Sequence, residues 1–356
     1  MTTIRVCASR NYHVLVERGL LARCGELAAQ VHAPCKAALI TDDGVPEQWI
    51  GAVEDSLTQA GFSLCRHTFE HGETHKTLYT VEAILNTLTE HNLTRGDLIV
   101  AMGGGIVGDV AGFAASCYLR GIPFIQIPTT LLAAVDSSVG GKTGVNLPAG
   151  KNLAGAFYQP SAVVCDPEAL STLPPEIFAD GAAESVKYGV LGDVELFEQI
   201  AAGGLSDPNQ LEGIIARCID LKRKLVESDE RDTGDRQRLK LGHTVGHAIE
   251  RVSNFSVTHG HAVAMGMVVI TRAAAKLGYC APGCPGRLIA ALQRNGLPTR
   301  CDYPADALCT AALQDKKRSG RAQVLVIPRF IGRAELVSVP VEEFHNWLRA
   351  GLDERG

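Results

Sequence analysis

The chain has 356 residues, of which 46% are hydrophobic and 21% are charged, and its formal net charge is −5 at pH 7. This composition is typical of a globular protein long enough for two domains, and the acidic balance argues against nucleic acid or an anionic membrane as the main partner. No apolar stretch is long enough to span a bilayer, and the first residues lack the pattern of a signal peptide. The 11 cysteines contain no C-x-x-C pair and indicate reduced thiols, so we expect a cytoplasmic protein.

Strand-like and helix-like runs alternate through the first half of the chain. The expected strands are Ile4–Ala8, Tyr12–Glu17, Ala37–Thr41, Ser63–Phe69, Leu98–Met102 and Phe124–Ile127. The expected helices are Leu20–Gln30, Pro46–Ala60, Leu78–His91 and Val107–Tyr118. Strands that alternate with helices predict a mainly parallel, Rossmann-like sheet covered by helices.

The pattern changes to helices after about Pro175. The expected helices are Phe178–Ile200, Leu211–Asp229, Leu239–Val252, Ala262–Leu277 and Pro285–Asn295. The runs Val324–Pro328 and Ala334–Val339 are expected to pair as a hairpin around Gly332. We therefore expect an α/β N-terminal domain over residues 1–170 and a mostly α-helical C-terminal domain over residues 171–356.

A glycine-rich turn follows the apolar run that ends at Met102. Gly103, Gly105 and Gly108 match the G-x-G-x-x-G pattern of dinucleotide-binding turns and precede Asp109. Glycines let the backbone approach a pyrophosphate, and the N-terminus of the following helix favours its negative charge. The acid expected about 20 residues further on is absent. The turn favours a dinucleotide, and the alternative is a tight strand-to-helix turn that needs glycine for packing alone.

Four histidines lie close together in the second half of the chain, beside glycines. His243 and His247 are spaced i, i+4 on one face of an expected helix, and His259 and His261 open the next helix. Zinc prefers nitrogen and carboxylate ligands, and catalytic zinc sites keep three protein ligands and one open position. Glu184 is the natural oxygen ligand. The spacing predicts a metal site and leaves open which three of these groups bind the ion.

A set of basic residues recurs in or beside these segments. Its members are Arg120, Lys142, Lys151, Lys187, Lys222, Arg236, Lys240, Lys316 and Lys317. In an acidic protein such a set favours a focused pocket for a polyanion. The alternative is a set of solvated surface charges. That alternative suits the charge runs around Lys222 and Lys316 better than Lys142 and Lys151, whose neighbours are small or apolar.

Taken together, these motifs closely resemble the 3-dehydroquinate synthase family of the sugar phosphate cyclase superfamily. The resemblance covers nearly the whole chain, through the segments Gly72–Lys76, Gly103–Gly112, Tyr118–Gly121, Pro128–Leu132, Asp136–Asn146, Gly150–Asn152, Glu184–Gly189 and Gly242–Glu250. It implies an NAD-binding α/β domain, a helical domain that binds zinc or cobalt, and usually a homodimer.

The resemblance also implies roles for individual residues. The implied NAD contacts are Asp42, Glu73, Lys76, Gly105, Gly108, Asp109, Thr129, Thr130, Lys142, Lys151 and Thr172. The implied metal ligands are Glu184, His243 and His259. The residues implied to hold the substrate oxygens, phosphate and carboxylate are Lys142, Asn152, Lys187, Lys222, Arg236 and His247. Arg120 is expected to reach the site of the neighbouring subunit.

The reaction that the resemblance implies is a step of the shikimate pathway, which leads to chorismate and the aromatic amino acids. A phosphorylated sugar acid, 3-deoxy-D-arabino-heptulosonate 7-phosphate, is converted into 3-dehydroquinate and phosphate. The implied course is transient oxidation by NAD, elimination of phosphate, re-reduction and an intramolecular aldol step.

Two positions depart from the family pattern. Lys240 stands where the family usually has Asn, and His261 stands where many members have Glu. Because Lys240 adds charge beside the expected substrate, a cyclase acting on sedoheptulose 7-phosphate stays an alternative, as does a metal-dependent NAD polyol dehydrogenase. Arg236 and Lys222 suit a substrate carboxylate and favour the shikimate reaction. His261 is either an extra metal ligand or, as we expect, a polar residue at a helix start.

Overall fold

The computed structural model describes residues 1–314 and 322–352, so Lys316 and Lys317 lie outside the described residues. The chain forms two compact units, Met1–Pro174 with Lys222–Arg231, and Pro175–Leu221 with Asp232–Gly356. The expected ranges 1–170 and 171–356 differ from this division in two respects. The division falls after Pro174, and the segment Lys222–Arg231 returns to the first unit.

The first unit contains a seven-stranded sheet with the strand order β1-β2-β9-β6-β5-β3-β4. Its strands are β1 Thr2–Val6, β2 Tyr12–Val16, β3 Lys36–Asp42, β4 Ser63–Phe69, β5 Leu98–Gly103, β6 Phe124–Pro128 and β9 Ala162–Cys165. The pair β1–β2 is antiparallel, and the other pairs are parallel. The predicted mainly parallel sheet is therefore confirmed.

Helices cover both faces of this sheet. They are α1 Cys24–Val31, α2 Glu47–Gln59, α3 Leu78–Glu90 and α4 Gly105–Cys117. Neighbouring strand residues enter opposite cores: Leu39 packs with the α1 and α2 side, and Ile40 packs with the α3 and α4 side. This alternation follows from the two-residue period of a strand. Because both faces are covered, β5 is buried along its whole length.

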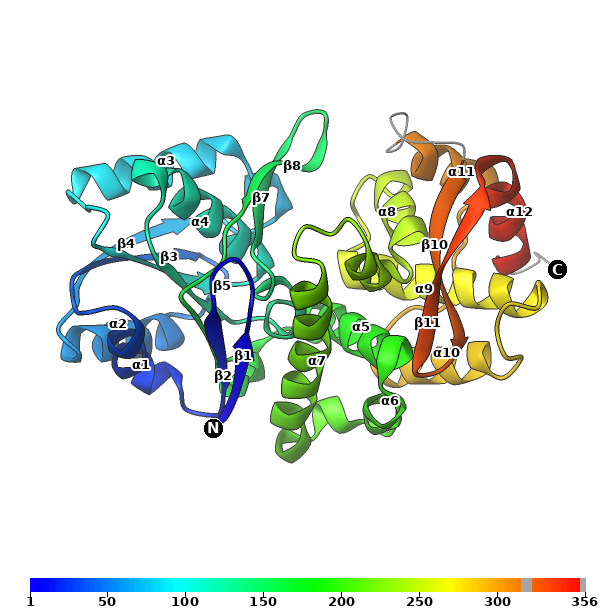
Figure 1. Cartoon of the computed structure of the whole chain (residues 1–356), viewed down its shortest axis with the longest axis horizontal. Helices are drawn as coiled ribbons and strands as arrows, with labels where there is room; N and C mark the ends of the chain where they lie inside the picture. The colour runs from blue at the N-terminus through cyan, green and yellow to red at the C-terminus, as the bar shows by residue number, and fades with distance from the viewer. Residues whose placement is uncertain (315–321, 353–356) are drawn as a thin grey trace. The chain divides into compact units, whose positions relative to one another are not determined.

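A second hairpin in the first unit was not predicted. It consists of β7 Lys142–Leu147 and β8 Gly150–Phe157, paired antiparallel (Figure 1). A Cβ atom added to Gly155 would lie 2.1 Å from the carbonyl oxygen of Thr143, so the strand contact itself requires glycine. Glycines weaken the sequence signal of a strand, which explains why the hairpin was missed.

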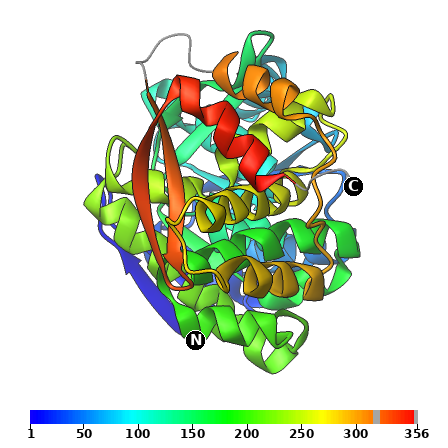
Figure 2. The same ribbon diagram turned by 90° about the vertical axis from the view of Figure 1, so that its right-hand side faces the viewer.

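The second unit is mostly helical, as predicted. Its helices are α5 Pro175–Gly192, α6 Val194–Ala201, α7 Pro208–Ser228 (whose last residues from Lys222 belong to the first unit), α8 His243–Val252, α9 His259–Lys276, α10 Cys284–Arg294, α11 Ala305–Gln314 and α12 Val341–Gly351. The expected hairpin is confirmed as β10 Ala322–Phe330 and β11 Arg333–Pro340, with Gly332 at a φ of 94° (Figure 2). The helices α11 and α12 were not predicted.

Two expected helices are each interrupted. The run Phe178–Ile200 breaks at Asp193, whose carboxylate accepts a hydrogen bond from the Leu196 amide and caps α6. The run Leu239–Val252 breaks at Gly242, which has a φ of 79° and starts α8. Among the described residues, no helix combines the length and the apolarity that crossing a bilayer requires.

Candidate active site

The glycine-rich turn joins β5 to α4 in the first unit. The Gly103 carbonyl accepts a hydrogen bond from the Thr129 amide at 2.9 Å. A Cβ atom added to Gly105 would lie 2.9 Å from Ser137 Oγ, and one added to Gly108 would lie 2.7 Å from Gln126 Oε1. Packing therefore accounts for glycine at both positions. The turn also presents the first amides of α4, which is the arrangement that binds phosphate groups.

Lys76 is the centre of a polar network beside this turn. Its buried ammonium donates to Asp109 Oδ2 on α4 and to Asn152 Oδ1 on β8, both at 2.6 Å. The Asn152 amide donates to Asn146 Oδ1 at 2.8 Å, and Asn146 Nδ2 donates to Glu73 Oε1 at 2.7 Å. The network thus ties the β7–β8 hairpin to α4 and to the turn at Glu73. Lys151 Nζ lies 3.8 Å from Glu73 Oε1 at its edge.

Burial is the main cause of the pKa shifts of two acids near the strand ends, Asp109 and Asp42. It raises the pKa of Asp109, against the opposing effect of the Lys76 ammonium. Burial likewise raises the pKa of Asp42, at the end of β3, although the Gly44 amide donates to its Oδ1 at 3.1 Å. Both carboxyl groups are therefore harder to ionise than free ones, and such groups at the ends of parallel strands mark a candidate binding surface.

The structure brings five predicted residues into this network, namely Glu73, Lys76, Asp109, Lys151 and Asn152.

Other predicted residues lie outside this network. Lys222 is buried and forms an ion pair with Asp136 Oδ1 at 2.7 Å. Thr172 instead accepts a hydrogen bond from Trp49 Nε1 at 3.0 Å. Arg120 is exposed at the turn after α4, with a φ of 68°. Lys142 is exposed at the start of β7, and Thr130 Oγ1 accepts from the Ala133 amide at 3.2 Å.

A His/Glu cluster in the second unit joins three helices. Glu184 from α5, His243 from α8 and His259 from α9 present ligand atoms that all lie within 4.8 Å of one another. Glu184 Oε1 lies 3.6 Å from His243 Nε2 and 3.7 Å from His259 Nε2. His243 Nδ1 donates to the Leu241 carbonyl at 3.1 Å, which leaves Nε2 toward the cluster.

This donor set fits a divalent cation. Two imidazoles and one carboxylate form a ligand set of catalytic zinc sites. Burial and the nearby Lys187 ammonium lower the pKa of His243 to about 3, so its ring is neutral. Burial alone would lower the pKa of His259, but its contacts with the buried acids Glu184 and Glu250 raise it to about 10. The two buried acids Glu184 and Glu250 thus make positive charge favourable in the cluster.

A second possible ligand group overlaps the first. It consists of His247, Glu250 and His259, with His259 Nδ1 lying 3.6 Å from Glu250 Oε2. The rings of His247 and His243 are 5.5 Å apart. Sequence spacing left the choice of ligands open, and the structure gives two overlapping groups that share His259: His243 lies with Glu184 in one, and His247 lies with Glu250 in the other.

The two departures from the family pattern have specific partners. His261 Nδ1 lies 2.9 Å from Asp180 Oδ1, and this contact raises the pKa of His261. His261 is in neither ligand group, so the helix-start role fits it better than a ligand role. Lys240 Nζ lies 3.0 Å from Asp232 Oδ2, so its added charge is paired. Arg236 is buried in the same short helical segment as Lys240, Asp235–Lys240.

Sequence reasoning missed Asn146, Glu250 and Asp180. Asp180 stands one helical turn before Glu184, and Glu250 stands one turn after His247, so helical spacing was the available signal.

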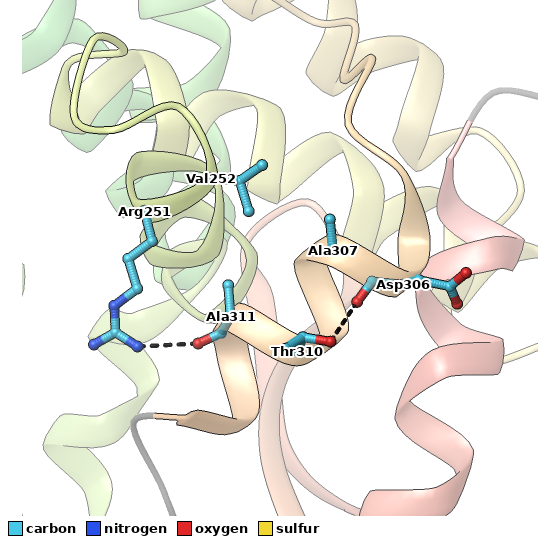
Figure 3. A pocket seen from close by; sticks show the side chains of 6 residues that line it. All are labelled: Arg251, Val252, Asp306, Ala307, Thr310 and Ala311. Carbon is cyan, nitrogen blue, oxygen red and sulfur yellow. Dashed lines mark hydrogen bonds between the residues drawn. The ribbon is translucent and has the colours of Figure 1, made fainter.

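A separate hollow of about 420 Å³ in the second unit contains none of the predicted residues (Figure 3). Its lining is Arg251, Val252, Asp306, Ala307, Thr310 and Ala311.

Comparison with solved structures defines the class of the protein. A 2-deoxy-scyllo-inosose synthase complexed with carbaglucose-6-phosphate, NAD+ and Co2+ is 28% identical, with a TM-score of 0.88 over 99% of this chain and 100% of that one. The 2-epi-5-epi-valiolone synthase ValA from Streptomyces hygroscopicus subsp. jinggangensis 5008, with NAD+ and Zn2+ bound, is 25% identical, with a TM-score of 0.88 over 97% of this chain and 98% of that one. The class is that of the sugar phosphate cyclases.

Sequence comparison identifies the family within this class. The model of the 3-dehydroquinate synthase N-terminal region matches residues 66–180, and that of the C-terminal region matches residues 181–318. A 3-dehydroquinate synthase of Streptococcus suis strain 05ZYH33 is 44% identical over 343 residues, which are 95% of this chain and 97% of that protein. The chain belongs to the 3-dehydroquinate synthase family.

Proposed function

We infer that this chain converts 3-deoxy-D-arabino-heptulosonate 7-phosphate into 3-dehydroquinate and phosphate, as an enzyme of the shikimate pathway. The observation that carries this inference is the 44% identity to a 3-dehydroquinate synthase over 95% of the chain. That span includes both the Lys76 network and the His/Glu cluster.

NAD is the proposed cofactor of the first unit. The proposed contacts are Asp42, Glu73, Lys76, Gly105, Gly108, Asp109, Thr129, Thr130, Lys142, Lys151 and Thr172. The backbone amides that begin α4 suit the pyrophosphate of NAD. Beside them, the hydrogen bonds of Lys76 hold α4 and the β7–β8 hairpin together. The NAD+ in two solved cyclases of this fold also supports the assignment.

A divalent cation, zinc or cobalt, is the proposed ligand of Glu184, His243 and His259. The donor set supports it, as do the Co2+ and Zn2+ of the two solved cyclases. When bound, NAD and the cation supply transient oxidation of the substrate and polarisation of the resulting ketone. His247 stays outside this ligand set and is proposed to bind the substrate phosphate.

The proposed substrate contacts combine cations with hydrogen-bonding groups. They are Lys142, Asn152, Lys187, Lys222, Arg236 and His247. Lys187, Lys222 and Arg236 are buried, and a buried ammonium or guanidinium group binds carboxylate and phosphate oxygens more strongly than an exposed one. These residues would hold the anionic substrate in place while phosphate leaves, and exclude water from the reactive intermediate.

A homodimer in the cytoplasm is the proposed state of the enzyme. Arg120 and Leu119 are both exposed, both have positive φ values, and lie next to each other at the turn after α4. An exposed arginine beside an exposed apolar side chain is suited to an interface, which supports a role for Arg120 at the partner subunit's site. None of the 11 cysteines, all of them within the described residues, forms a disulfide, which suits a reducing compartment.

Parallel assays with two heptulose phosphates test the proposed substrate. Purified protein with NAD and Co2+ should release phosphate from 3-deoxy-D-arabino-heptulosonate 7-phosphate much faster than from sedoheptulose 7-phosphate. The pairing of Lys240 with Asp232 supports this preference, because it offsets the charge that sets this chain apart from its family. Faster release from sedoheptulose 7-phosphate would replace the proposed function with that of another cyclase.

A further inference from the structure

Asp180, on α5, contacts both sides of the segment that contains His259. Its Oδ1 atom accepts hydrogen bonds from Thr258 Oγ1 at 2.7 Å, from the His261 backbone amide at 3.1 Å and from His261 Nδ1 at 2.9 Å. A single carboxylate oxygen therefore holds the residue before His259 and the second residue after it.

The backbones of α5 and α9 also touch at this point. A Cβ atom added to Gly260 would lie 2.3 Å from both the Cα atom and the carbonyl oxygen of Asp180. Glycine is thus required for the two helices to meet, and the Asp180 side chain then fastens the start of α9 to α5. The position of His259 relative to α5 is set at two independent contacts.

Glu184 follows Asp180 by one turn of the same helix, so both side chains lie on one face of α5. Glu184 and His259 are two of the three groups that gather in the His/Glu cluster. Because α5 is a continuous helix, whatever fixes the start of α9 against Asp180 also fixes the separation between these two ligand atoms.

We propose that Asp180 is a positioning residue for the cation site, acting through Thr258 and His261 to hold His259 at ligand distance from Glu184. The inference rests on the proposed site of Glu184, His243 and His259. It gives His261 a role as the partner of Asp180. Groups that orient metal ligands in this way typically change metal affinity by about 10–100-fold when they are removed.

Direct cation binding tests the proposal without measuring turnover. Metal-free wild-type protein and its variants are titrated with Co2+, and affinity and visible absorption spectrum are recorded at a temperature where every variant is folded. Asp180→Ala removes all three contacts, whereas Asp180→Asn keeps one acceptor oxygen. Asp193→Ala is the matched control, because Asp193 also caps a helix of this unit but contacts Leu196 and Arg217 instead of the cluster.

The expected result is a 10–100-fold weaker affinity in Asp180→Ala, an intermediate value in Asp180→Asn and no change in Asp193→Ala. Wild-type affinity in Asp180→Ala, or equal losses in Asp180→Ala and Asp193→Ala, would overturn the proposal. If Asp180→Ala does not fold, the Co2+ affinities of Asp180→Asn and Thr258→Val test the proposal instead. Wild-type affinity in both of these variants would overturn the proposal. Wild-type protein that binds no Co2+ would instead refute the cation site on which the inference depends.

Discussion

Lys76 shows how a single buried charge can organise a binding surface. Its ammonium joins Asp109 on α4 to Asn152 on β8, and its carbonyl accepts a hydrogen bond from the Asn146 amide at 2.9 Å. The sequence points to Lys76 through the family resemblance only. The partners of Lys76 lie 33 and 76 residues away, and local sequence patterns carry no information about such contacts.

Replacement of Lys76 by Met should destabilise the protein strongly. The half-buried Asp109 carboxylate would lose its buried cationic partner, and breaking a buried ion pair in this way costs up to about 3–5 kcal/mol. Lys151→Met, at the more exposed edge of the network, should cost about 1 kcal/mol or less. Urea denaturation measures both free energies of unfolding, and equal losses in the two variants would contradict the role given to Lys76.

Replacing His243 and replacing His247 should have different effects, because only His243 is a proposed metal ligand. His243→Ala removes a proposed ligand, so the purified variant should retain little cation after gel filtration. His247→Ala should retain the cation and lose turnover by at least about 10²-fold, as expected when a group that stabilises charge is removed. Metal analysis and steady-state rates decide between these outcomes. Equal loss of metal from both variants would show that the division between His243 and His247 is wrong.

His67, on β4, should make stability depend on pH. Burial lowers the pKa of His67 from 6.5, so the folded state binds this proton less tightly than the unfolded state. The contribution of His67 to the free energy of unfolding is therefore fully present above the pKa that His67 has in the unfolded chain. It is lost as the pH falls through 6.5 toward the lower pKa of the folded state. In His67→Asn this dependence disappears.

Urea denaturation of both proteins from about pH 8 to pH 5 measures this effect. The stability of wild type relative to His67→Asn should be constant at high pH and decrease as the medium becomes acidic. A difference that stays constant, or that grows in favour of wild type at low pH, would contradict the lowered pKa of His67.

Periodicity predicted six of the seven strands of the main sheet and its covering helices, but it missed β9, and it failed where glycine or a cap decides. Helical periodicity continues through Asp193 and Gly242, yet a new helix starts at each of them, at Asp193 through a side-chain cap and at Gly242 through a left-handed backbone conformation. The His/Glu cluster shows a related limit. Helical spacing placed His243 and His247 on one face, but only the packing of α5, α8 and α9 decides that His243 faces Glu184.

Gly260→Ala tests the contact between α5 and α9. The new methyl group would lie 2.3 Å from the Asp180 backbone, so the helices must separate, with a cost of about 1–3 kcal/mol or more. Gly213→Ala is the control, because Gly213 lies in α7 with no atom near the added Cβ. That exchange should stabilise the protein by about 0.5–1 kcal/mol. Thermal and urea unfolding measure both, and a neutral Gly260→Ala would contradict the close contact.

For the whole molecule, the sequence predicted the parallel sheet and the helical second half but not the path of the chain between the two units. The segment Lys222–Arg231 returns to the first unit, where Lys222 pairs with Asp136 and Glu230 Oε1 accepts from Gln159 Nε2 at 2.8 Å. Such a return depends on contacts between distant residues, and a boundary inferred from the change to a helical pattern cannot show it. Family resemblance supplied the remaining functional detail.

One assay decides whether the proposed cofactor NAD is restored in every turnover. Purified protein is incubated with 3-deoxy-D-arabino-heptulosonate 7-phosphate, NAD and Co2+, while released phosphate and NADH absorbance are followed together. The predicted result is one phosphate released per substrate consumed, with no net accumulation of NADH. Steady accumulation of NADH in proportion to the substrate consumed would contradict the claim and indicate an ordinary dehydrogenase.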